Sequence, residues 1–337
     1  LFYGREQLTA ELLAHLRQHH LLAVVGASGS GKSSLVRAGL VPALLKSEPL
    51  ADGTMPLEGS TRWPIHIMTP TAHPLKVLAA SLTRDNESVT ATTTLMDDLA
   101  HDGRSLDLYV SRLLSRRAST TPTTNDCLLL VVDQFEELFT LCHEKSEQKS
   151  FVDNLLTATE STGQTRVVLT LRADFYAQCA EFDNLRTALE RYQRYIGPMS
   201  AEELRLAIEE PARLGSWEFE SGLVDELLSD IGVGVNRRPE PGALPLLSHA
   251  LLETWKRRRG RMLTLAGYVE SGKVEGAIAQ TADQVYKQLS PQQQVITHNV
   301  FVRLTEFGEG TQDTRRRVAL RNATKRGGMP ILTIFGR

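Results

Sequence analysis

Residues 26–33 form a pattern that binds the phosphates of nucleotides. Their sequence, Gly-Ala-Ser-Gly-Ser-Gly-Lys-Ser, fits GxxxxGK[ST] at every fixed position. Glycines in such a loop let backbone N–H groups turn inward around phosphate oxygens, because glycine tolerates positive φ and close approach. The alternative is a flexible turn rich in glycine and serine, but the pattern lies between an expected strand and an expected helix, as a phosphate loop requires.

Each residue type in this loop has an expected task. We expect Lys32 to contact the β- and γ-phosphates and the Ser33 hydroxyl to ligate Mg²⁺. The following helix, expected to end at Pro42, points its positive end at the same anion. The expected nucleotide-binding residues of the loop are Gly26, Ala27, Ser28, Gly29, Ser30, Gly31, Lys32, Ser33 and Ser34. The loop contacts phosphates alone and does not identify the base, although no Asn-Lys-x-Asp motif of GTPases is present.

Acidic residues follow a second apolar run. Residues 127–132 are Cys-Leu-Leu-Leu-Val-Val, and residues 133–137 are Asp-Gln-Phe-Glu-Glu. Asp133, at the tip of a buried strand, is the expected second partner of Mg²⁺. Either Glu136 or Glu137 could orient or deprotonate the attacking water, and their spacing does not choose between them. The alternative is that both begin a solvent-facing helix and complement its dipole.

A third apolar run, 166–171, ends at Arg172, and Asp174 lies close behind. A guanidinium at a strand tip beside the phosphate loop could detect the γ-phosphate through a two-pronged contact. The alternative is an ordinary surface ion pair, which contributes little. The expected catalytic residues are therefore Lys32, Glu136, Glu137 and Arg172.

Strands and helices must alternate to position these residues. Four apolar runs predict strands, at 21–25, 63–68, 127–132 and 166–171. Such runs suit a parallel sheet with helices on both faces, so we predict an α/β, three-layer P-loop NTPase domain over residues 1–198. The polar stretches 85–94 and 115–126, rich in Thr and Ser, are expected surface loops.

The pattern becomes helical after residue 198. Ser200, followed three residues later by Glu203, predicts a capped helix start, and Pro211 is expected to end that helix. We predict a helical lid domain over 199–275. Further helices and a glycine-containing stretch predict a winged-helix-like region over 276–318, and residues 319–337 an irregular C-terminal tail.

Composition excludes several classes of protein. The 337 residues carry a formal net charge of −2, which argues against a protein built mainly to coat nucleic acid. Three cysteines without CxxC spacing imply neither a disulfide framework nor a zinc site and favour a reducing cytosol. No signal peptide or membrane-spanning stretch is evident, so we predict a cytoplasmic location. The chain begins with Leu1 rather than Met, and we expect a piece of a longer protein.

Several separate motifs together resemble the STAND class of P-loop NTPases, and most closely the bacterial novel STAND NTPases, over about residues 1–318. Residues 2–6 (Phe-Tyr-Gly-Arg-Glu) resemble the GRE motif, 26–33 the Walker A loop, 133–137 an extended Walker B motif, Arg172 the sensor-1 arginine, and 242–245 (Gly-Ala-Leu-Pro) the GxP motif of the lid. The glycine-to-proline gap is one residue longer than usual, and no Met-His-Asp triplet is found in the winged-helix-like region.

The resemblance implies an ATPase that binds ATP or ADP with Mg²⁺, hydrolyses ATP slowly and acts as a signal-transduction switch. It implies that Arg5 lies against the adenine and that Pro245 touches the base. From the residues alone, Arg5 is a basic residue before a helix and Pro245 a helix-start signal. The resemblance further implies self-association in the ATP state and fusion to WD-type repeats or another effector.

Two other functions fit parts of the sequence. A motor ATPase of the AAA+ type needs an arginine finger, worth about 10³–10⁵ in rate, and no spacing singles one out. A regulatory ATPase that binds nucleic acid through the winged helix could use the basic runs 256–261 or 315–317, although such runs are usually solvated helix ends. We expect no membrane partner.

Overall fold

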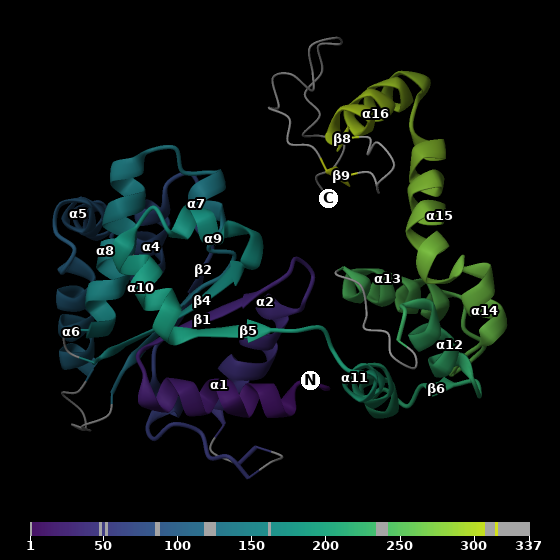
Figure 1. Cartoon of the computed structure of the whole chain (residues 1–337), viewed down its shortest axis with the longest axis horizontal. Coiled ribbons are helices and arrows are strands. Elements are labelled where there is room, and N and C mark those ends of the chain that lie inside the picture. Colours follow the sequence, from purple (N-terminus) through teal and green to yellow (C-terminus); the bar gives the residue numbers. More distant parts are fainter. Residues whose placement is uncertain are drawn as a thin grey trace. The chain divides into compact units, whose positions relative to one another are not determined.

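A computed structural model of the chain describes residues 2–46, 49–50, 53–84, 88–117, 126–160, 163–233, 242–306 and 314–315. The chain divides into two compact units. The first consists of Leu1–Leu247 with Gly260–Met262, and the second of Ser248–Arg259 with Leu263–Arg337. Figure 1 shows the course of the chain and labels most of its helices and strands.

A five-stranded sheet forms the centre of the first unit. Its strands are β1 (Leu21–Gly26), β2 (Ile65–Met68), β3 (Leu128–Val132), β4 (Thr165–Arg172) and β5 (Gln193–Ile196), in the order β2-β3-β4-β1-β5. All neighbouring strands are parallel. The predicted α/β class with a parallel sheet is therefore confirmed, and each of the four expected strands is present.

The sequence did not predict β5. This strand lies at the edge of the sheet and pairs with β1 alone. Of its four residues only Ile196 is buried, since an edge strand faces solvent along one side. It therefore lacks the continuous apolar run by which the central strands were recognised.

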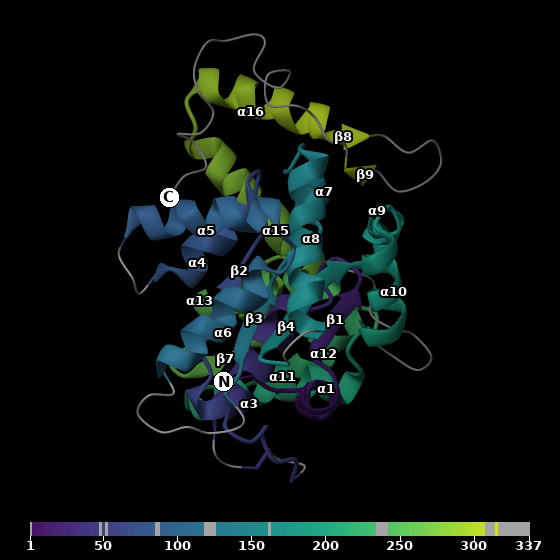
Figure 2. The ribbon, with the colours of Figure 1, turned by 90° about the vertical axis from the view of Figure 1, so that its left-hand side faces the viewer.

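Helices cover both faces of the sheet because alternate strand residues point in opposite directions. Leu21, Ala23 and Val25 of β1 belong to one core, and Leu22 and Val24 to the other. The first core is closed by α4 (Pro74–Leu82), α5 (Val89–His101), α6 (Ser105–Arg117), α8 (Lys145–Glu160) and α10 (Asp183–Tyr192), and the second mainly by α1 (Glu6–Gln18) and the helical run after β1. Figure 2 shows this layering from a second side.

The helical run after β1 continues past Pro42, where we had expected it to end. It consists of α2 (Lys32–Ser34), the π-helical turn η1 (Leu35–Leu40) and α3 (Val41–Leu45). In a regular α-helix the ring of Pro42 would clash with the carbonyl four residues earlier. The wider π turn, in which the Val41 N–H donates to the Val36 carbonyl, accommodates the proline.

Two expected surface loops are partly helical. Helix α5 begins at Val89, and the Ser88 hydroxyl accepts a hydrogen bond from the Ala91 N–H as its N-cap. Helix α6 extends to Arg117. The prediction failed here because threonine and serine are common in loops, whereas buried Leu95 and Leu99 hold α5 against the core. Residues 85–87 and 118–125 lie outside the described residues.

The remaining elements of the first unit follow the sheet. Short helices α7 (Glu137–Thr140) and α9 (Tyr176–Cys179) adjoin strands β3 and β4. Helix α11 (Ala201–Leu214) begins with the predicted capping box, but it continues past Pro211. The elements β6 (Glu218–Phe219) and α12 (Leu223–Asp230) come next, and α13 (Ala243–Lys256) starts in this unit.

The second unit is mostly helical. It contains α14 (Leu265–Glu270), α15 (Lys273–Gln288) and α16 (Pro291–Leu304), after the short strand β7 (Met262–Leu263). Strands β8 (Thr305–Glu306) and β9 (Thr314–Arg315) pair antiparallel. The winged helix and the boundaries at 198, 275 and 318 stay predictions, and residues 319–337 lie outside the described residues. None of the described helices has the length and apolar character to cross a membrane.

Asn154 of α8 offers a test of the first core. Its Oδ1 accepts a hydrogen bond from the Leu106 N–H at 3.1 Å, and its Nδ2 donates to the Leu99 carbonyl at 2.8 Å. Both groups lie in terminal turns that lack partners within their own helices. We expect Asn154→Ala to lower the free energy of unfolding by about 2 kcal/mol, measured by urea denaturation, because it leaves both groups buried and unpaired.

The matched control lies on the same helix. Lys149 pairs with Asp153 on the exposed surface of α8. Lys149→Ala should change the free energy of unfolding by less than about 0.5 kcal/mol. Equal effects of the two substitutions would contradict the role assigned to Asn154.

Candidate functional site

The phosphate loop, Asp133 and Arg172 meet at one edge of the sheet. Gly26 at the end of β1 is paired with Arg172 at the end of β4. Val132 of β3 is paired with Leu169 of β4, which places Asp133 beside Thr170. Because the strands are parallel, their carboxyl ends share one edge, where α/β folds bind ligands.

The backbone of the phosphate loop has the form of an anion cradle. Gly29 and Gly31 have φ angles of 74° and 87°. A Cβ on Gly26 would lie 2.8 Å from the Ile196 carbonyl oxygen and 2.9 Å from Ser30 Oγ, so only glycine fits there. Within the described structure, the buried Ser30 hydroxyl has no hydrogen-bond partner. A buried hydroxyl without a protein partner in a glycine-rich loop is available to donate a hydrogen bond to a phosphate oxygen of a ligand.

Lys32 lies folded onto the same loop. Its Nζ donates hydrogen bonds to the carbonyls of Gly26, at 3.0 Å, and Ala27, at 2.7 Å. Burial lowers the pKa of Lys32, whereas the nearby negative charge of Glu136 acts in the opposite direction. The ammonium group is therefore held at the loop, where a phosphate-binding cation was expected.

Asp133 is the centre of a hydrogen-bond network. Its Oδ1 accepts from Ser33 Oγ at 2.7 Å and from Thr170 Oγ1 at 2.6 Å. Its Oδ2 accepts from Arg37 Nε at 2.7 Å. Burial alone would raise the pKa of Asp133, but the hydrogen bonds from Thr170, Ser33 and Arg37 outweigh burial and hold the pKa below its usual value. An ionised carboxylate and a neighbouring hydroxyl oxygen are oxygen ligands of the kind that Mg²⁺ prefers.

The sequence alone did not identify two residues of this network as parts of the site. Thr170 is a polar residue inside the apolar run 166–171, and that interruption was its only signal. The sequence around Arg37 carries no signal of a functional role, because half-exposed arginines on helices are common. Thr170 also accepts a hydrogen bond from the Gln134 N–H at 2.8 Å. Gln134 has a φ of 55°, uncommon for a residue other than glycine, and this bond helps to hold the turn after β3.

Both candidate water-orienting glutamates lie near Asp133. Glu136 Oε2 accepts a hydrogen bond from the Arg172 N–H at 3.3 Å. Glu137 begins α7, as the alternative interpretation of a helix start suggested. Burial, followed by the negative charges of Glu136 and Asp133, raises the pKa of Glu137. Three carboxylates thus gather beyond the end of β3.

The guanidinium of Arg172 makes a two-pronged ion pair with Asp174. Nε lies 3.0 Å from Oδ1 and Nη2 lies 2.5 Å from Oδ2. The guanidinium also lies 5.4 Å from the centre of the Phe175 ring. The surface ion pair that the sequence left open is therefore present, and detection of the γ-phosphate by Arg172 stays a prediction.

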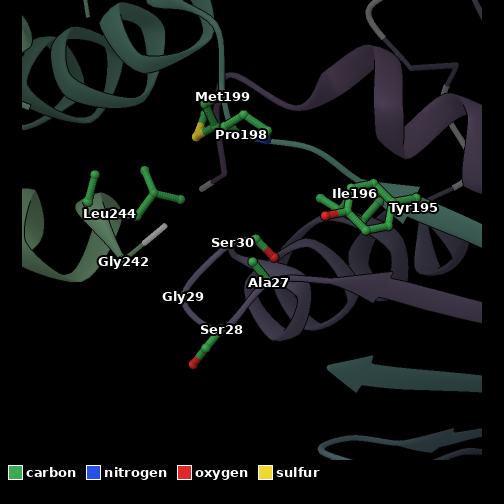
Figure 3. A pocket seen from close by; sticks show the side chains of 11 residues that line it. Ala27, Ser28, Gly29, Ser30, Tyr195, Ile196, Pro198, Met199, Gly242 and Leu244 are labelled. Atoms are coloured by element: carbon green, nitrogen blue, oxygen red, sulfur yellow. The ribbon is translucent and has the colours of Figure 1, made fainter. Parts of the chain in front are cut away.

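A pocket of about 120 Å³ adjoins the phosphate loop within the first unit (Figure 3). Its walls are residues 27–30, Tyr195 and Ile196 of β5, Pro198, Met199, and Gly242, Ala243 and Leu244 at the start of α13. Most of these side chains are apolar, as is usual for pockets that bind small organic molecules. Pro245 does not line the pocket but lies close to Gly29, with its Cγ 3.3 Å from the place that a Cβ on Gly29 would occupy.

Arg5 is buried and contacts the segment that leads into α11. Its Nη1 donates to both oxygens of Glu203, at 3.2 and 3.3 Å, and its Nη2 donates to the Gly197 carbonyl at 2.7 Å. Contacts of Arg5 and Pro245 with adenine stay predictions.

Thr170→Val tests the Asp133 network, because it keeps the side-chain shape but removes the hydroxyl. We expect it to lower the free energy of unfolding by about 1–3 kcal/mol at neutral pH. The pKa of Asp133 is lower in the folded than in the unfolded protein, so its contribution is complete above the unfolded pKa and is lost as the pH falls through the folded pKa. The effect of the substitution should therefore be constant near neutral pH and should shrink only as the pH falls below the unfolded value of about 3.9.

Urea denaturation at several pH values checks this expectation. Thr93→Val, at an exposed position of α5 where the hydroxyl donates only to its own helix, is the control. A loss for Thr170→Val that stays constant with pH would mean that Thr170 does not hold the charge of Asp133.

Comparisons with known proteins were made for the sequence and for the fold. The Walker-type ATPase of Pyrococcus abyssi is similar in fold, with a TM-score of 0.51 and 13% identity over 90% of this chain and 81% of that one. The ORC1 protein of Aeropyrum pernix in complex with DNA has a TM-score of 0.51 and 15% identity over 90% and 72% of the two chains. The ORC2 protein of that organism, in ADPNP and ADP complexes, has a TM-score of 0.51 and 17% identity over 89% and 73%.

At such low identity these structures establish the fold alone. The comparison with curated proteins gave no match. The family model described as Novel STAND NTPase 1 matches residues 1–331. Since this match spans almost the whole sequence and the fold is that of P-loop ATPases, the chain belongs to the Novel STAND NTPase 1 family.

Proposed function

We propose that the protein binds ATP and ADP with Mg²⁺ between the phosphate loop and Asp133, and hydrolyses ATP slowly as a signal-transduction switch. The observation that carries this proposal is the hydrogen bond of 2.7 Å between Ser33 and Asp133, which joins the two expected Mg²⁺ partners. Membership of an NTPase family supports nucleotide hydrolysis in general.

Each side chain at the sheet edge has a proposed task. Lys32 supplies the positive charge for the β- and γ-phosphates, and the N–H groups of the loop surround the phosphate oxygens. Ser33 and Asp133 hold Mg²⁺, which when bound neutralises negative charge on the phosphates. The Ser33 hydroxyl donates its hydrogen bond to the Asp133 carboxylate, so its oxygen lone pairs remain available for the metal.

The apolar pocket beside the loop supports recognition of an adenine base. Its walls offer flat contact surfaces rather than a set of charged groups. A protein of similar fold is known in complex with ADPNP and ADP, which also favours adenine nucleotides.

Glu136 is the better placed of the two glutamates to orient water. The Arg172 N–H holds its carboxylate at the end of β4. The negative charge of Glu136 acts to raise the pKa of Lys32, so its carboxylate lies within electrostatic reach of the phosphate loop. Glu137 lies at the start of α7 and serves as the comparison residue.

A switch needs contacts that distinguish ATP from ADP. Reversing a conformational equilibrium from one state to the other takes about 5.5 kcal/mol of differential binding. The γ-phosphate could supply much of it by engaging Lys32 and by replacing Asp174 as the partner of Arg172. We infer that self-association follows in the ATP state and that repeats or an effector outside these residues receive the signal.

Nucleic-acid binding and motor activity are less well supported. One protein of similar fold is known in complex with DNA. In the basic run 256–261, however, Lys256 and Arg257 both pair with Glu253. The guanidinium of Arg258 lies over the Trp255 ring, 4.0 Å from the ring centre. These contacts leave less positive charge for phosphates. A fast motor would turn over well above about one ATP per second without a partner.

Calorimetry tests nucleotide binding directly. We expect Lys32→Met to weaken ATP and ADP binding at least about ten-fold, because the loop loses its cation. Asp133→Asn should bind nucleotide without Mg²⁺ as the wild type does, but should lose the gain in affinity that Mg²⁺ provides. Lys149→Ala, on the exposed face of α8, is the control. A folded wild-type protein that binds neither ATP nor ADP would refute the proposal.

The same proteins test the switch. Light scattering should detect larger assemblies with ATP than with ADP, and Lys32→Met should remove the difference. A wild-type protein that binds both nucleotides but keeps one mass would leave nucleotide binding intact and reject the switch.

Single-turnover hydrolysis separates the two glutamates. We expect Glu136→Gln to slow the chemical step by about 100-fold or more while ATP affinity is retained, because the residue that orients water acts on the reaction rather than on binding. Glu137→Gln should have a smaller effect. The reverse order would assign the role to Glu137.

A further inference from the structure

The residues Gly4, Arg5 and Glu6 form a joint with the first turn of α11 and the segment that leads into it. Gly4 has a φ of 83°, and a Cβ there would lie 2.1 Å from the Glu203 carbonyl oxygen and 3.0 Å from Met199 Cε. Its N–H donates to the carboxylate of Glu6, at 3.0 Å from Oε2. Only glycine allows the two backbones to approach this closely.

Arg5 is anchored on both sides of this joint. Its carbonyl accepts hydrogen bonds from the Thr9 N–H, at 2.9 Å, and from Thr9 Oγ1, at 2.8 Å, which fixes it at the start of α1. Its guanidinium reaches Glu203 and the Gly197 carbonyl. Only 8% of the surface of Arg5 is exposed. These partners therefore have to balance its positive charge and accept the hydrogen bonds of its guanidinium in place of water.

Glu203 has two tasks at the other side. Its Oε2 accepts a hydrogen bond from the Ser200 N–H at 2.7 Å, and its own N–H donates to Ser200 Oγ at 3.1 Å. The same carboxylate accepts from Arg5. Arg5 thus holds the segment at Gly197 and Glu203 holds it at Ser200, so the two residues fix both ends of a short stretch.

Between these fixed ends lie Pro198 and Met199, which form one wall of the pocket beside the phosphate loop (Figure 3). Neither Arg5 nor Glu203 is among the described residues that line the pocket. We propose that Arg5 and Glu203 are positioning residues, which hold the Pro198–Met199 wall in place and so contribute to affinity for the base of a nucleotide rather than for its phosphates. This inference rests on the proposed nucleotide binding.

Separate measurement of the two parts of the ligand tests the inference. Calorimetry with ADP and with inorganic tripolyphosphate is compared for the wild type, Arg5→Met, Glu203→Gln and the double variant. We expect each single variant to bind ADP about ten-fold more weakly and tripolyphosphate less than about two-fold more weakly. The double variant should lose less affinity than the product of the two single losses, because both substitutions remove the shared contact between Arg5 and Glu203.

A matched control and a milder variant complete the set. Glu202→Gln removes the same charge from the exposed neighbouring position and should bind both ligands as the wild type does. Arg5→Lys keeps the charge but cannot reach Glu203 and Gly197 together, so its loss of ADP affinity should be intermediate. Thermal unfolding identifies any variant that is not folded, and Arg5→Lys then decides the question.

Three outcomes would overturn the inference. If Arg5 touched the base directly, Glu203→Gln would leave ADP affinity unchanged or improve it while Arg5→Met lowered it. Equal losses for ADP and tripolyphosphate would mean that the joint supports the whole loop. Variants that match the wild type on both ligands would remove the role entirely. A wild type that binds neither ligand would instead refute the proposed function.

Discussion

The buried carboxylate of Asp133 is the group on which the arrangement of the site depends. Removing a charge from water is costly unless donors replace the lost solvation. Here the donors are the hydroxyls of Ser33 and Thr170, the N–H of Gln134 and the guanidinium of Arg37. They come from the helical run after β1, from β4 and from the turn after β3. One charge therefore ties the phosphate loop to the centre of the sheet.

This network also requires one register of the sheet. Thr170 reaches Asp133 because Val132 is paired with Leu169. A slip of one residue would turn the Thr170 side chain to the opposite face and would exchange the two cores. The alternation of Val167 and Leu169 into one core with Val168 into the other therefore fixes the chemistry at the edge as well as the packing.

The sequence predicted the features that are local, and missed those that depend on distant pairing. Continuous apolar runs gave β1, β3 and β4, and the capping box at Ser200 was visible because its partner is three residues away. The edge strand β5 has no such run. Pro42 led us to predict the end of a helix, although a π turn lets the helical run continue past it. Thr170 and Arg37 acquire meaning only beside Asp133. The link from Arg5 to Glu203 spans 198 positions, beyond any local pattern.

In the proposed binding mode, the base and the γ-phosphate of a nucleotide would contact different parts of the first unit. The pocket wall at Pro198 and Met199 would meet the base, which ATP and ADP share, so it cannot distinguish the two. The γ-phosphate is the only difference, and Lys32 and Arg172 are the cations expected to meet it. Arg172 already holds a carboxylate in the two-pronged geometry that a phosphate would take. We therefore expect the discrimination on which a switch depends to arise at the sheet edge, and the proposed role of the joint at Arg5 and Glu203 is to set how firmly either nucleotide is held.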